Sequence, residues 1–140
     1  MQLGELLSSL LVNLQSLIKT EVNLGRASFP KIIALSIIPP DGLEMSVLAK
    51  RMGIDNSTAT RLVLGMEIAG WVNRQSYSYD KRVTQVFLTN KGYSLQGDLE
   101  EQFALIGNVV EESLNPPDKV KILDSLSSLN WVLLKLIANK

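Results

Sequence analysis

The stretch MSVLAKRMGIDNSTATRLVLGMEIAG, residues 45–70, decides the fold of this chain. It predicts a short helix over residues 46–52 that ends at Gly53, because glycine readily adopts the left-handed conformation that closes a helix. Asp55 or Asn56 is suited to cap a second helix, which closes at the last glycine of the stretch. That helix is predicted to bury Ala59, Leu62, Val63 and Met66. Two short helices joined by a glycine-containing turn make a helix-turn-helix.

A β-hairpin is predicted directly after this helix pair. Residues 71–75 and 82–88 are rich in β-branched and aromatic side chains, and they flank a polar stretch over residues 76–81. This pattern is typical of two paired strands with a projecting loop. The expected fold is mostly α with a small β-hairpin wing, that is, a winged helix-turn-helix.

Long helices are predicted on both sides of this region. Leucines recur at helical spacing from Leu3 and indicate a first helix of about 20 residues. A shorter helix over residues 29–38 must end at Pro39-Pro40, since proline cannot continue it. Thr89 is a good cap for a long helix, which Pro116-Pro117 interrupts before a last helix.

The first and last helices are more apolar than packing on one side of a small domain requires. Leucine and isoleucine occupy nearly a full turn over residues 133–137. The alternative is that both helices pack into the core of the monomer, but we favour a dimer interface. Exposing several leucines forfeits about 1.5 to 3 kcal/mol for each side chain.

Composition excludes most enzyme classes. The 140 residues include no cysteine and no histidine, which removes thiol nucleophiles, thiolate metal sites, disulfides and imidazole acid-base chemistry. The neighbouring acids Glu100-Glu101 and Glu111-Glu112 lie on polar helix faces and indicate solvated surfaces. We expect no enzymatic activity, no cofactor and no metal.

The formal net charge is zero, but the charge is unevenly distributed. Residues 41–92 carry seven basic against five acidic side chains, whereas residues 93–140 carry four basic against seven acidic ones. A small positive excess therefore coincides with the predicted winged helix. The N-terminal residues lack the basic segment of a secretory signal, and we expect a cytoplasmic protein that does not enter a membrane.

Several short motifs occur in a fixed order along the middle of the chain. They are Leu48-Ala49, Gly53, Ser57-Thr58-Ala59-Thr60-Arg61, Gly70, Asp80-Lys81-Arg82 and Leu88-Thr89-Asn90-Lys91-Gly92. Each motif alone is weak, but together their order and spacing resemble the MarR family of bacterial and archaeal regulators.

The resemblance implies a single MarR-like domain over residues 1–140. Dimerisation helices would occupy residues 1–28 and 93–140, and the winged helix-turn-helix residues 29–92. It further implies a homodimeric transcriptional regulator, expected to be a repressor, that binds a pseudo-palindromic operator in double-stranded DNA and responds to a small-molecule effector of unknown identity. Its recognition helices would enter successive major grooves, and each wing would reach a minor groove.

Eight residues are the predicted site residues. We expect Ser57, Thr58, Thr60, Arg61, Arg74, Lys81 and Arg82 to contact DNA, and Asp80 to structure the wing. Hydroxyls near a helix start can bond phosphates or base edges, and an arginine can bind guanine through two hydrogen bonds. An arginine on the hairpin suits a narrow minor groove. The alternatives are helix capping by Ser57 and Thr58 and a plain surface charge for Arg82.

The chain departs from the family pattern in two places. Leu64-Gly65 and Ile68-Ala69 stand where family members usually carry charged residues, and fewer cations mean fewer neutralised phosphates. Tyr77 and Tyr79 place two aromatic rings near the wing tip. These departures motivate an alternative function, a winged-helix protein-interaction module with little DNA affinity.

Overall fold

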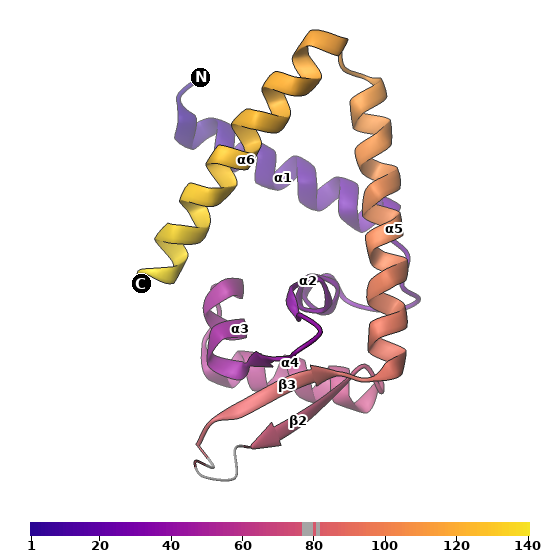
Figure 1. Ribbon diagram of the computed structural model, residues 1–140, viewed down its shortest axis with the longest axis vertical. Coiled ribbons are helices and arrows are strands. Elements are labelled where there is room, and N and C mark those ends of the chain that lie inside the picture. The colour runs from indigo at the N-terminus through magenta and orange to yellow at the C-terminus, as the bar shows by residue number, and fades with distance from the viewer. Residues whose placement is uncertain (77–79, 81) are drawn as a thin grey trace.

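The computed structural model describes residues 1–76, 80 and 82–140 (Figure 1). The elements are α1 (Leu3–Glu21), α2 (Phe29–Ile37), β1 (Leu43–Glu44), α3 (Met45–Met52), α4 (Asn56–Ile68), β2 (Val72–Ser76), β3 (Thr84–Leu88), α5 (Asn90–Glu112) and α6 (Pro116–Ala138). This order confirms the predicted winged helix-turn-helix fold with long flanking helices.

The molecule has a compact head, formed by α2, α3, α4 and the sheet, and an extended limb, formed by α1, α5 and α6 (Figure 1). Helices α2, α3 and α4 pack with the sheet in the head, where Leu35, Leu48, Val63 and Met66 are fully buried. Helix α5 leaves the head, and α6 turns back from its far end until its C-terminus lies near α3. There the Lys50 Nζ donates a hydrogen bond of 3.0 Å to the Ala138 carbonyl. The head therefore has its own core, whereas α1 and α6 contain no buried residue.

The turn between α3 and α4 forms as the sequence predicts. Gly53 has a φ of 68°, and the Ile54 amide donates to the Ala49 carbonyl at 3.0 Å. Of the two candidate caps, Asp55 is the one that caps α4, and its carboxylate accepts from the Thr58 amide at 2.7 Å. These bonds satisfy backbone groups that the helix ends leave without a partner, so they fix where each helix stops.

The wing is a three-stranded antiparallel sheet in the order β1-β3-β2. In the hairpin Val72 pairs with Leu88 and Ser76 with Thr84. The predicted first strand was one residue early, and the predicted second strand began two residues early. Strand β1, which pairs Leu43 with Val86, was not predicted because two residues carry no periodic signal.

A tight junction joins the wing to α5. Thr89 caps the helix by accepting from the Gly92 amide at 3.0 Å, and its hydroxyl donates to the Gly70 carbonyl at 2.5 Å. A Cβ added at Gly92 would collide with the Trp71 carbonyl, so this close approach requires glycine. The Leu88-to-Gly92 motif therefore fixes the direction in which α5 leaves the head.

Two glutamines hold α5 to earlier parts of the chain. The buried Gln96 side chain donates from Nε2 to the Leu35 carbonyl at 2.8 Å and to the Ile38 carbonyl at 2.7 Å. Gln102 exchanges two hydrogen bonds with the backbone of Asn23, at 2.6 and 2.9 Å. Both contacts join α5 to residues more than fifty positions away, and no sequence pattern indicated them.

Candidate nucleic-acid interface

Helix α4 presents a continuous outward face. Ala59, Val63 and Met66 are completely buried on its inner side, whereas Ser57, Thr60 and Arg61 are exposed on the other. A spacing of three or four residues keeps side chains on one face of a helix, which is why the split is clean. Of the four residues predicted to be buried, the three on the inner side are buried and Leu62 is half-buried against the core. The exposed set contains three of the predicted site residues.

The hydroxyl groups near the start of α4 differ in their hydrogen bonds and exposure. Thr58 is half-buried, and hydrogen bonds from its backbone amide and hydroxyl lower the pKa of the Asp55 carboxyl below its usual 3.8. Thr60 Oγ1 donates to the Asn56 carbonyl at 2.8 Å, which leaves its oxygen lone pairs facing outward. Thr58 thus takes part in the capping interaction, whereas Ser57 and Thr60 are the hydroxyls that a ligand can reach.

Arg82 lies two residues before β3, at the loop end of the hairpin, and its side chain is 91% exposed. The Asp80 carboxylate accepts from the Arg82 backbone amide at 3.0 Å and from its Nε at 3.2 Å. Because the guanidinium keeps its two outer nitrogens clear of this pair, it can still bind an anion. Asp80 therefore turns the chain and orients Arg82 at the same time.

A hollow of about 250 Å³ lies between the wing and the helix pair. Its lining residues are Glu44, Met45, Ser46, Asn56, Thr60, Arg82, Val83 and Thr84. The hollow brings Thr60 of α4 and Arg82 of the wing to one surface, although they are 22 positions apart. Ser46 and Asn56 were not among the predicted site residues, since an isolated polar side chain gives no signal before the fold is known.

The other predicted site residues lie elsewhere. Arg74 on β2 forms an ion pair with Glu67 of α4, with Nη2 3.1 Å from Oε1, and both side chains are about one-third exposed. The contact joins the wing to α4 and neutralises the one acidic side chain on the C-terminal half of that helix. Lys81, like Tyr77 and Tyr79, lies outside the described residues.

A second surface is formed by the limb. Large apolar side chains are exposed on α1 at Leu3, Leu11 and Val12, and on α6 at Leu123, Trp131, Val132 and Leu136. No helix in the described ranges is long and apolar enough to cross a membrane. An apolar surface of this extent is typical of a protein-protein interface.

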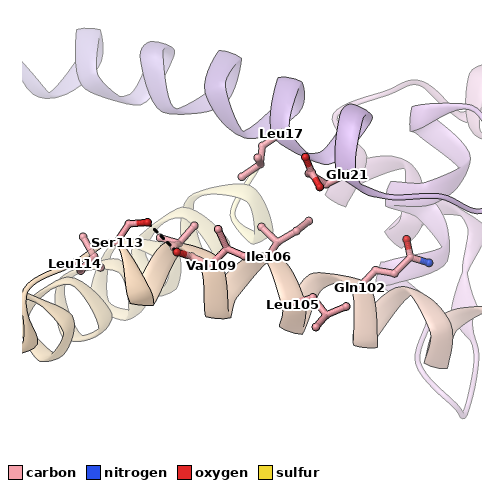
Figure 2. A pocket seen from close by; sticks show the side chains of 9 residues that line it. Leu17, Glu21, Gln102, Leu105, Ile106, Val109, Ser113 and Leu114 are labelled. Atoms are coloured by element: carbon pink, nitrogen blue, oxygen red, sulfur yellow. Dashed lines mark hydrogen bonds between the residues drawn. The ribbon is translucent and has the colours of Figure 1, made fainter.

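An open cavity of about 430 Å³ separates the end of α1 from α5. Figure 2 shows Leu17 and Glu21 projecting from α1 toward Ile106 and Val109 on α5. The remaining lining residues are Gln102, Leu105, Val110, Ser113 and Leu114. The walls are mostly aliphatic, and Glu21 and Gln102 supply polar groups at one end.

A metal centre has no support in the described residues, where no three acidic side chains cluster closely enough to hold an ion.

The helix-turn-helix and the hairpin that follows it define a winged helix-turn-helix protein. The MarR family model matches residues 40–84, which cover α3, α4 and most of the wing. A curated relative, the HTH-type transcriptional regulator TtmR of Methylorubrum extorquens, is 27% identical over 103 residues, or 73% of this chain. The match spans about half of that relative's length, 52%.

Solved structures agree with this fold over nearly the whole chain. A MarR transcriptional regulator from Methanosarcina mazei is 24% identical with a TM-score of 0.80, and the match covers 95% of this chain and 96% of that one. FabT from Streptococcus pneumoniae, solved in complex with DNA, is 22% identical with a TM-score of 0.75 and the same coverage. Together with the family match over residues 40–84, these likenesses show that the chain has the fold of MarR proteins.

Proposed function

We propose that this chain is a sequence-specific, double-stranded DNA-binding transcriptional regulator that acts as a homodimer on a pseudo-palindromic operator. One observation carries the proposal: Thr60 on the outward face of α4 and the exposed Arg82 of the wing line the same hollow. Two elements that could reach adjacent parts of a duplex are thereby held in one orientation. The FabT structure contains DNA, which is consistent with this use of the fold.

The exposed side chains suit distinct contacts. Ser57 and Thr60 at the start of α4 would bond phosphates or base edges, and Arg61 would bind guanine in the major groove. Arg82 would enter the minor groove, where the negative potential is strongest. Thr58 would act through the cap of α4, and Arg74 by keeping the wing against that helix. Lys81 stays a predicted DNA contact.

Dimerisation is proposed through residues 1–28 and 93–140. Helices α1 and α6 expose apolar side chains along their length and bury none within the monomer, so a second copy would cover them. Pairing two heads through such an interface places the two α4 helices at a fixed separation. Half-sites about one helical turn apart would then be engaged together.

A small-molecule effector is proposed to bind the cavity between α1 and α5. The aliphatic walls suit an apolar ligand, and Glu21 and Gln102 suit a polar or cationic group at one end of it. Because Gln102 also holds Asn23, a ligand that takes over this amide would loosen the segment that leads from α1 into the head. Release from the operator by such a ligand would make the protein a repressor.

Fluorescence anisotropy with Arg82→Ala tests the DNA-binding proposal. We expect binding to a selected operator to weaken about tenfold, since a good base or groove contact contributes about 1 to 3 kcal/mol. The melting temperature should stay unchanged because the side chain is almost fully exposed. Arg26→Ala, which removes an exposed cation between α1 and α2, is the matched control and should bind normally. Unchanged affinity of Arg82→Ala would remove the wing from the interface.

The alternative, a protein-interaction module, is favoured by one observation: Ile68 on α4 is 80% exposed and apolar. Binding of random duplex at two salt concentrations separates the two functions. A steep loss of affinity with salt supports the regulator, because phosphate contacts release counterions. Absence of binding at low salt supports the module, and light scattering that finds only monomers at micromolar concentration contradicts the homodimer.

A further inference from the structure

An apolar side chain interrupts the polar outward face of α4. Ser57, Thr60 and Arg61 are followed on the same face by Leu64, three residues after Arg61, and then by Ile68. Leu64 is 43% exposed and Ile68 is 80% exposed. A leucine in this place cannot form hydrogen bonds, so it can recognise only a partner with an apolar group of its own.

The surroundings of Leu64 are cationic. Arg61 lies one turn before it, is exposed, and interacts electrostatically with Asp55 at the start of α4. On the α2 flank, the Lys31 side chain covers the neighbouring Gly65, where an added Cβ would lie 3.2 Å from the Lys31 Nζ. The acidic Glu67 is neutralised by Arg74. An apolar side chain next to Arg61 on α4, with Lys31 over the neighbouring Gly65, suits a polyanion that carries an apolar group better than an apolar protein surface.

Duplex DNA offers one such group. In the major groove, thymine alone of the four bases presents an apolar C5-methyl, and the other base edges present hydrogen-bonding groups that leucine would leave unpaired. With a rise of about 1.5 Å per residue, Leu64 lies roughly 10 Å along the axis of α4 from Ser57. Ile68 lies one turn further, roughly 16 Å from Ser57, and is therefore farther from the N-terminal residues, which contact the base edges in a helix-turn-helix.

We propose that Leu64 is a specificity-determining residue that selects thymine at one position of each half-site through the C5-methyl group. The proposal rests on the proposed function, because it requires α4 to enter the major groove. Leu64 would thus have a specific function at a position where family members usually carry a charged residue. Ile68, one turn further from the N-terminus of α4, would not select a base.

The experiment compares thymine with uracil, which differ only by this methyl group. Duplexes are first selected from a random pool with the wild-type protein, and each thymine of the half-site is then replaced by uracil in turn. We expect the replacement of thymine by uracil at one position of each half-site to lower the affinity about fourfold, the equivalent of about 0.8 kcal/mol for one buried methyl. In Leu64→Ala the ratio of the affinity for the thymine duplex to that for the uracil duplex should fall to about one. In Ile68→Ala this ratio should stay near four.

The outcomes distinguish a failure of the proposed role of Leu64 from a failure of the proposed DNA binding. The thymine-to-uracil ratio is measured within one protein, so a partly unfolded variant does not distort it. Selective duplex binding without any uracil-sensitive position, or with a ratio that Leu64→Ala leaves unchanged, overturns the role of Leu64 and leaves DNA binding intact. A ratio abolished by Ile68→Ala instead would also overturn it. Failure to select any duplex at low salt overturns both proposals.

Discussion

Replacement of Gln96 by leucine should destabilise the protein strongly, although Gln96 touches no proposed ligand. Helix α2 ends where Pro39 has no N–H to give to the Leu35 carbonyl, and Gln96 supplies that donor at 2.8 Å. Its Nε2 also donates to the Ile38 carbonyl at 2.7 Å. Both acceptor residues are almost completely buried, so Gln96→Leu leaves two carbonyls without a partner.

The expected loss is about 2 to 4 kcal/mol, since a buried polar group left unsatisfied costs about 1 to 3 kcal/mol. A loss of about 3 kcal/mol should lower the melting temperature by roughly 10 °C in a chain of this size. Urea unfolding at a fixed protein concentration is the appropriate measurement, because dimerisation would make stability depend on concentration.

Gln102→Leu is the matched control, because it makes the same substitution on the same helix. Its partner, Asn23, is exposed, so water can replace the lost hydrogen bonds and the cost should stay near 1 kcal/mol or below. If Gln96→Leu proves no more costly than Gln102→Leu, the two α2 carbonyls have found other donors and the reasoning about the end of α2 is wrong.

Two further substitutions test the local structure. Gly92→Ala should cost about 1 to 3 kcal/mol by overpacking against the Trp71 carbonyl, whereas Gly97→Ala on the same helix meets open space and should be neutral or stabilising; equal melting temperatures would contradict the close approach. Asp55→Asn should remove stability that is fully present above the ordinary carboxyl pKa of 3.8 and is lost as the pH falls through the lower pKa that hydrogen bonds from Thr58 produce in the folded protein. The difference between wild type and Asp55→Asn in acid unfolding curves should therefore shrink steadily as the pH falls from that value, and a difference that does not change with pH would refute an ionised cap.

Local chemistry made much of the candidate site predictable. Gly53 and Asp55 act on residues within four positions of themselves, so the turn and the start of α4 could be read directly from the chain. The inward face of α4 followed from its periodicity in the same way. The charge pattern was less informative, because Arg74 proved to be paired with Glu67, a contact between a strand and a helix that no local pattern reports.

The sequence by itself determined the order of the elements, their caps and the separation of apolar from polar faces, because these depend on interactions between residues near one another in the chain. Only the tertiary structure decided that Thr60 and Arg82 share one hollow, that Gln96 completes the end of α2 and that Lys31 lies over Gly65. Such contacts join residues tens of positions apart, and their geometry depends on how the wing and α5 pack against the helix pair. Periodicity fixes which face of a helix is buried, but only packing fixes what that face meets.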